Sequence, residues 1–171
     1  FRGSWSFTAH QRVYEADNDE QLQLYTGGLS ETVGVSITQS LSRDSRDHPE
    51  FPTIGSLMAI SSSISGGPLG GNEDFHKHVL NLEWYTPTVW KFVLMSSVKI
   101  GGIKTLKSND GERSMVPFNE RFIMGGSGMV YGDPLRGYED NKIGPITSSG
   151  GPFGGNALIK VTSEFRIPFS E

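Results

Sequence analysis

The chain has 171 residues, of which 35% are hydrophobic and 11% aromatic, with 22 glycines, no cysteine and a net charge of −4. This composition, rich in glycine and aromatic residues, is typical of β-structure with frequent turns. The charge provides no basic surface for nucleic acid, and the lack of cysteine excludes a disulfide framework, a thiolate metal site and a Cys nucleophile. No apolar run reaches the length of about 18 residues that predicts a transmembrane helix, but alternating barrel strands stay compatible with the composition.

Alternating apolar and polar residues predict about six β-strands. Residues 1–14 place Trp5 and Phe7 on one face and Ser, Thr, His and Arg side chains on the other. Residues 29–41 repeat this pattern, with Val33 and Ile37 on the apolar face. Both segments are long enough to cross a membrane as barrel strands, which need about 9–11 residues.

Three shorter candidates follow, around residues 57–64, 80–85 and 92–100. The last candidate, residues 157–167, shows the clearest alternation, because Ile159 and Val161 face one way while Lys160 and Glu164 face the other. Charges on that second face belong in water or in a polar lumen. The sequence therefore predicts an all-β, antiparallel fold.

The connections between these strands alternate in length. Those near residues 49–55 and 86–89 are short, whereas those at 15–28, 66–74 and 104–155 are long. Short turns on one side and long outer loops on the other are the layout of outer-membrane barrels. Aromatic residues near the strand ends agree with an interfacial girdle: Trp5, Trp84, Tyr85, Trp90 and Phe92. The same alternation also describes half of a soluble sandwich or jelly roll, so both interpretations stay open at this point.

Motifs for catalysis or metal binding are weak. His76 and His78 would project from one side of a strand, but no third ligand is near them, so we predict no metal site. Residues 61–63 lack the turn and the nearby His of a hydrolase, and residues 125–128 lack the Lys of a phosphate loop. We predict no catalytic residue and no cofactor. A charged cluster at one strand end is interpreted as structural: Arg43, Asp44, Arg46 and Asp47.

Residues 117–127 form the most specific segment. They end in Gly125-Gly126-Ser127 and are followed by Leu135-Arg136-Gly137-Tyr138. This arrangement resembles the long sixth extracellular loop of BamA-type barrels, in the outer-membrane insertase and surface antigen superfamily, whose Arg-Gly-aromatic tip follows a Gly-Gly-Ser. The spacer, residues 128–134, is longer than is usual in that family. Further matches occur in the family's order at residues 42–47, 51–56, 66–71 and 154–168.

The resemblance implies an antiparallel transmembrane β-barrel of sixteen strands. Residues 1–171 would supply about six of them within the C-terminal barrel domain, and flanking strands and periplasmic POTRA domains would lie outside this chain. In the family the loop folds back into the lumen, and the Arg of its tip, here Arg136, contacts the inner wall. Gly137 would turn the backbone, Tyr138 would add packing and a hydroxyl group, and Glu164 is the carboxylate partner that this sequence offers.

The function implied by the resemblance is the folding and insertion of β-barrel proteins into the outer membrane of a Gram-negative-type bacterium, without covalent chemistry. The implied partners are outer-membrane lipids, unfolded β-barrel substrates and accessory lipoproteins of an assembly (BAM) complex. A sister transporter with the same barrel, of the TamA type or the pore of two-partner secretion, is the near alternative. A soluble all-β binding module, such as a lectin-like sandwich, is the alternative of another class.

Overall fold

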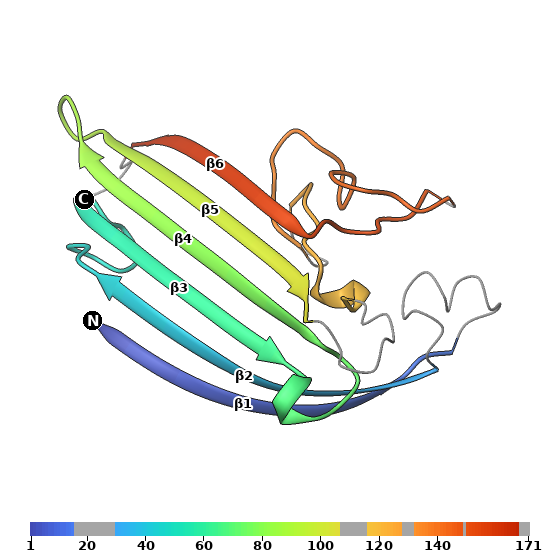
Figure 1. Ribbon diagram of the computed structural model, residues 1–171. Coiled ribbons are helices and arrows are strands. Elements are labelled where there is room, and N and C mark those ends of the chain that lie inside the picture. The colour runs from blue at the N-terminus through green and yellow to red at the C-terminus, as the bar shows by residue number, and fades with distance from the viewer. Residues whose placement is uncertain (16–29, 107–115, 128–131, 149, 168–171) are drawn as a thin grey trace.

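The computed structural model describes residues 1–15, 30–106, 116–127, 132–148 and 150–167. Its six strands form one antiparallel sheet in sequence order (Figure 1): β1 (Arg2–Val13), β2 (Glu31–Asp44), β3 (Gly55–Ser65), β4 (Phe75–Pro87), β5 (Val93–Thr105) and β6 (Ala157–Arg166). Two short 3-10 helices lie in connections: η1 (Gly67–Leu69) and η2 (Phe118–Glu120). No helix among the described residues is long and apolar enough to cross a membrane. The predicted all-β, antiparallel fold of about six strands is confirmed.

β4 is longer than the sequence pattern predicted. Alternation identified only residues 80–85, whereas β4 begins at Phe75 and pairs with β5 over its full length and with β3 from Phe75 to Tyr85. The difference arises because His76 and His78 place polar side chains on the face that is apolar further along the strand. Because of these two histidines, the first part of β4 does not show the apolar/polar alternation by which a strand is recognised in the sequence.

The convex face of the sheet is apolar and open. One row of register partners crosses it from β2 to β6, formed by Leu41, Ile60, Leu80, Ile100 and Ile159. Within this row Leu41, Ile60 and Ile100 are 40–49% exposed, and Ile159 is 71% exposed. Phe7, Val161 and Phe165 on the same face are 67–70% exposed. The described residues contain no second sheet to cover them, although a soluble sandwich would bury such a face. The arrangement is that of a membrane barrel wall, with apolar residues outward.

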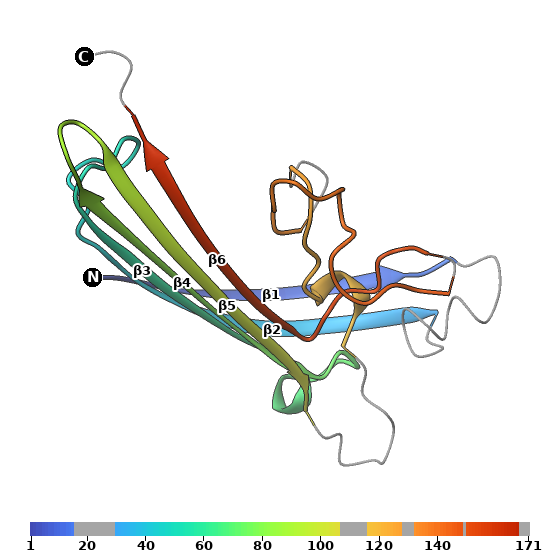
Figure 2. The same cartoon turned by 90° about the horizontal axis from the view of Figure 1, so that it is seen from above.

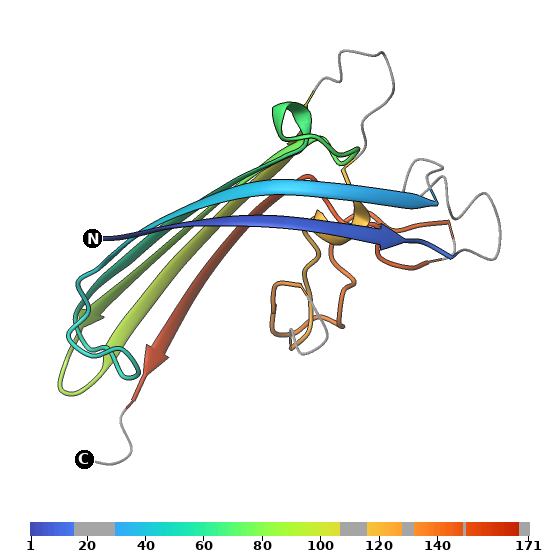
Figure 3. The ribbon, with the colours of Figure 1, turned by 90° about the horizontal axis from the view of Figure 1, so that it is seen from below.

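The buried clusters lie on the opposite face of the sheet. This face is the concave one, and the connection between β5 and β6 lies within its curve (Figures 2 and 3). One cluster joins the strands to the connection between β5 and β6 and consists of Phe75, Ile103, Val116, Phe122 and Leu158. A second, smaller cluster consists of Tyr85, Val93 and Met95. The buried side chains therefore lie on the concave face of the sheet, the same face that the connection between β5 and β6 contacts.

The connections separate only in part by length: the predicted short connection, residues 45–54, is one residue longer than the predicted long one, residues 66–74, because β2 ends at Asp44 and β3 begins only at Gly55. The connection between β5 and β6 is long, as predicted. Residues 45–54 and 88–92 connect strands at one end of the sheet, and residues 66–74 and 106–156 connect them at the other (Figure 1). The predicted long connection at 15–28 falls on residues 16–29, which lie outside the described residues. In the first short turn, Asp47 accepts backbone hydrogen bonds from Thr53 at 2.9 Å and Ile54 at 3.2 Å. A hydrogen bond from the Thr53 hydroxyl, together with these backbone bonds, lowers the pKa of Asp47 below its ordinary value.

Candidate functional site

The connection between β5 and β6, residues 106–156, is the main feature of the concave face, and we call it the inner loop. Its described parts are residue 106 and residues 116–127, 132–148 and 150–156. Figures 2 and 3 show it inside the curve of the sheet. Because most of its backbone lies outside the sheet ladder, its position depends on side-chain contacts with the strands.

Phe122 anchors the inner loop to the sheet. Its ring is buried in the apolar cluster that β4, β5 and β6 share. Gly101 of β5 lies beneath the ring, and a Cβ added to Gly101 would be 2.5 Å from Cζ of Phe122, which packing does not permit. Phe122 and Gly155 also exchange two backbone hydrogen bonds, at 2.9 and 2.7 Å. The ring therefore occupies space that only a glycine leaves open.

Two cations of the sheet hold η2, at the start of the described loop. Lys77 of β4 donates from Nζ to the carbonyl oxygen of Glu120 at 2.7 Å, and Nζ lies 3.3 Å from Oε2 of the same residue. Arg12 of β1 places Nη2 3.7 Å from Oε1 of Glu120. Lys77 also lies 5.2 Å from the ring centroid of Phe122, within cation–π range. The loop is thereby connected to strands on two sides of the concave face.

Glu73, in the connection between β3 and β4, is a carboxylate whose side chain is only 2% exposed. Thr32 donates to Oε1 at 2.7 Å, Arg12 donates from Nη1 to both oxygens at 3.1 and 3.3 Å, and Nε2 of His10 lies 3.1 Å from Oε2. Gly34 leaves room for this cluster, since an added Cβ would lie 2.6 Å from Oε2. The buried charge is tolerated because each oxygen has partners. Arg12 contacts Glu120 as well, so one guanidinium joins this connection to the inner loop.

Asp133 of the inner loop lies between two lysines of the sheet. Lys99 of β5 and Lys160 of β6 are register partners, and like charges directly opposite each other destabilise a sheet. Asp133 forms an ion pair with Lys99 and lies 3.9 Å from Nζ of Lys160. Lys160 also donates to the carbonyl oxygen of Pro134 at 3.3 Å. The loop therefore supplies the carboxylate that offsets two facing cations.

The two parts of the predicted loop motif are hydrogen-bonded to each other. Gly126 donates its N–H to the carbonyl of Tyr138 at 3.1 Å, and Leu135 donates to the carbonyl of Gly126 at 3.0 Å. Gly125 donates to the carbonyl of Asp133, also at 3.0 Å. Of the spacer between the two parts, residues 128–131 lie outside the described residues.

Asp140 fixes the Gly-Gly-Ser segment from the other side. Its Oδ1 accepts the N–H of Ser127 at 2.9 Å. A Cβ added to Gly126, which has a φ of 59°, would lie 1.7 Å from this same oxygen. The backbone conformation and the close carboxylate both require glycine here.

The tip residue Arg136 is open to solvent, with its side chain 92% exposed. Nη1 lies 3.8 Å from Oε1 of Glu164, whose other oxygen lies 3.6 Å from Nη2 of Arg166. An exposed pair of this kind contributes about 0–1 kcal/mol. Gly137, with a φ of 88°, turns the chain, and the side chain of Tyr138 is exposed. The structure brings Arg136 and Glu164 together, and their functional role stays a prediction.

The charged cluster predicted at a strand end lies at the end of the sheet away from the inner loop. Arg46 donates to both carboxylate oxygens of Asp44, at 2.9 and 2.7 Å. Asp47 binds the backbone of its own turn, while Cζ of Arg43 lies 5.7 Å from the ring centroid of Phe1. These residues stabilise the turn and do not contribute to the loop site.

Arg121 illustrates how the inner loop packs on itself. Its guanidinium donates to the carbonyl of Val116 at 3.2 and 3.3 Å, and its Cζ lies 3.9 Å from the ring centroid of Phe153. Burial lowers the pKa of Arg121, but guanidinium groups stay charged at neutral pH. The cation thus joins two distant parts of the loop through a carbonyl and an aromatic face.

Sequence reasoning missed the main anchors of the loop. Phe122 lay within the segment that carried the resemblance, but nothing in the pattern distinguished it from its neighbours. A signal for Asp133 did exist, because Lys99 and Lys160 fall on the polar faces of neighbouring predicted strands and need an anion. The role of Glu73 depends on the path of its connection, which the sequence pattern did not indicate.

Comparison with known proteins identifies the family. The chain matches the Omp85 superfamily domain over residues 1–171. It is 29% identical over 154 residues to the outer membrane protein assembly factor BamA of Nitratidesulfovibrio vulgaris, covering 90% of this chain and 18% of that protein. It is 30% identical over 131 residues to BamA of Neisseria meningitidis, covering 74% and 15%, respectively. A SAM50-like protein of Schizosaccharomyces pombe is 30% identical over 145 residues, covering 79% and 28%.

A solved structure shows the same fold. The crystal structure of BamA from Haemophilus ducreyi lacking POTRA domains 1–3 matches with a TM-score of 0.73 and 19% identity, covering 99% of this chain and 34% of that chain. The chain spans less than a fifth of the length of the two BamA relatives. Membership in an outer-membrane barrel family accounts for the open apolar convex face and excludes the soluble binding module. The chain therefore belongs to the Omp85 superfamily, and its six strands correspond to part of a BamA-type outer-membrane β-barrel.

Proposed function

We propose that this chain is the loop-bearing part of a barrel that folds and inserts β-barrel proteins into the outer membrane. The observation that carries the proposal is the inner loop, held on the concave face by Phe122, Glu120 and Asp133. Two BamA relatives are outer membrane protein assembly factors, which supports this activity over transport by a sister barrel. The whole protein would span the outer membrane several times through its strands.

The proposed activity needs no covalent chemistry and no cofactor. An assembly factor of this kind lowers the barrier to strand pairing and membrane insertion, which for an unassisted strand includes the cost of unpaired backbone groups in hydrocarbon. The residues of this chain would act by keeping the inner loop in the lumen, rather than by pairing with a substrate strand. Unfolded β-barrel substrates, outer-membrane lipids and accessory lipoproteins are the proposed partners.

Within the loop we propose that Arg136 pins the tip to the wall through Glu164. A guanidinium offers a planar set of donors that a lysine cannot reproduce, so the geometry of the tip would depend on arginine itself. The contact is long and exposed in this structure, which is compatible with a tip that engages and releases.

The test uses the full-length protein reconstituted in liposomes and an unfolded outer-membrane β-barrel substrate. Substrate folding is followed as the band that stays compact on a gel unless boiled. We expect the wild-type protein to accelerate folding over empty liposomes, Arg136→Ala to lose most of the acceleration, and Arg136→Lys to restore only part. Lys142→Ala, which removes an exposed cation from the same loop outside the motif, serves as the control.

Two results would contradict the proposal in different ways. Normal acceleration by Arg136→Ala would remove the tip from the mechanism and leave the assembly function standing. A wild-type protein that accelerates no substrate, yet releases a polypeptide across the bilayer, would instead assign the barrel to a TamA-type or two-partner secretion transporter.

A further inference from the structure

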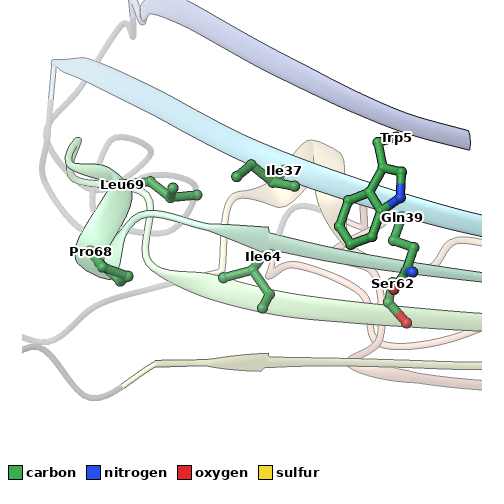
Figure 4. Close-up of a pocket in the computed structure, with 7 residues that line it drawn as sticks. All are labelled: Trp5, Ile37, Gln39, Ser62, Ile64, Pro68 and Leu69. Carbon is green, nitrogen blue, oxygen red and sulfur yellow. The ribbon is translucent and has the colours of Figure 1, made fainter.

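The convex face carries an apolar hollow of about 300 Å³. Figure 4 shows Pro68 and Leu69 of η1 at one end of it and Trp5 at the other. Ile37 and Ile64 line the middle, and the polar members are Gln39 and Ser62. The hollow exists because η1 carries apolar side chains beside the outer surface of β2 and β3. Its lining is suited to a hydrocarbon chain rather than to water.

Three nitrogen-bearing side chains lie beside the hollow on the same face. Ile64 is the register partner of His76, and His76 is the register partner of Lys104. His78 is the register partner of Ser62, which lines the hollow. Directly opposite partners in a sheet project to the same side, so the row leads from the apolar hollow to an ammonium group. Such a group on an outward barrel face is costly in hydrocarbon and acceptable near the interface.

The hydrogen bonds within this row allow an arrangement that suits an anion. Nδ1 of His78 lies 3.0 Å from Oγ of Ser62, and Nε2 of His78 lies 3.1 Å from Nδ1 of His76. A neutral imidazole has one N–H and one acceptor nitrogen. When the Ser62 hydroxyl donates to His78, His78 must donate to His76, and the remaining proton of His76 is then on Nε2. This arrangement offers an N–H donor together with the ammonium of Lys104.

The position of the row in the barrel indicates where such an anion would come from. His76 and Lys104 lie at the end of the sheet that carries η1 and the inner loop (Figure 1). In the outer-membrane layout the long loops are on the outside, so this end faces the outer leaflet. An anion beside an apolar hollow at this level is the headgroup of a lipid. Asp74, the acidic residue two positions before His76, is already engaged, because it accepts a hydrogen bond from the N–H of Gly67 at 2.5 Å.

We propose that the convex face holds a specific site for a phosphate-bearing lipid of the outer leaflet. One acyl chain occupies the hollow between Leu69 and Trp5, and the headgroup phosphate binds His76 and Lys104. The site does not depend on the assembly activity proposed above. It rests on the outward orientation of the convex face in an outer-membrane barrel.

Native mass spectrometry of the full-length protein in detergent tests the site. The probes are dioleoyl phosphatidylglycerol, dioleoylglycerol, which has the same chains but no phosphate, and inorganic phosphate. We expect the phosphatidylglycerol to bind about tenfold more tightly than dioleoylglycerol, the order of magnitude that one or two cations at a membrane surface supply. His76→Gln combined with Lys104→Gln should remove this preference, and Leu69→Ala should weaken both lipids.

His48→Gln, in a turn at the opposite end of the sheet, is the matched control and should change nothing. A heat-modifiability gel establishes that each variant still forms a barrel before binding is measured. Equal binding of the two lipids, or an unchanged preference in the double variant, would overturn the proposal. Complete competition by inorganic phosphate would also overturn it, because the site would then recognise a free anion rather than a lipid.

Discussion

Two positions of the inner loop, only three residues apart, are held very differently: Asp133, which we call the base, and Arg136, the tip. Asp133 at the base is 14% exposed and faces two lysines, whereas Arg136, three positions later, is 92% exposed and reaches one carboxylate at 3.8 Å. The base therefore has the contacts that hold the loop, and the tip has the side chain that can change partners. We therefore expect Arg136, the residue that is most recognisable in the sequence motif, to contribute less to stability than Asp133.

Removal of the apolar anchor should have the largest effect. Phe122→Ala would empty a buried site that is shaped by Gly101, and truncation of a buried Phe costs about 3–5 kcal/mol. We expect limited proteolysis of the full-length protein to cleave the inner loop much faster while the strands stay paired. Phe51→Ala, at an exposed position in a short turn, is the control. Similar cleavage rates in the two variants would show that the ring does not hold the loop.

Removal of the negative charge of Asp133 should have an intermediate effect. Asp133→Asn leaves Lys99 opposite Lys160 without an anion, and we expect a loss of about 1–2 kcal/mol in denaturant unfolding of the full-length protein. Lys160→Gln in the same background should restore part of this loss, because the facing cation is gone. A double-mutant cycle that shows simple additivity would contradict the proposed compensation.

Truncation of the tip should change stability least among the loop substitutions. Arg136→Ala should alter the unfolding free energy by less than about 1 kcal/mol, because the side chain and its ion pair are exposed. The same variant is expected to lose assembly activity. A stability loss as large as that of Asp133→Asn would mean that base and tip share the anchoring.

A turn outside the loop gives the smallest effect and a defined pH dependence. Hydrogen bonds lower the pKa of Asp47 in the folded protein, so its contribution to stability is present at neutral pH and is lost as the pH falls through this lowered value. Asp47→Asn should therefore be slightly less stable than the wild type at pH 7, with the difference vanishing in strong acid. Unfolding curves recorded from neutral to acidic pH would show this convergence, and a constant difference would contradict it.

The sequence predicted the sheet well because each barrel strand has one apolar and one polar face, and the period of two is a local property. The predicted bounds failed at β4, where His76 and His78 interrupt the apolar face. The site was harder to predict. The resemblance indicated Arg136, Glu164 and the Gly-Gly-Ser segment, but the contacts of Phe122, Asp133 and Glu73 depend on how a long connection returns to strands distant in sequence. No local pattern encodes such a path.

The facing pair of Lys99 and Lys160 also has a consequence for how the barrel wall forms. Pairing β5 with β6 closes the connection from residue 106 to residue 156 and at the same time brings two ammonium groups opposite each other. Both the chain entropy of closure and the charge repulsion oppose this hairpin until Asp133 arrives between the lysines. We therefore expect hairpin formation and loop placement to be coupled, so that a state with β6 paired to β5 but Asp133 away from the lysines is sparsely populated.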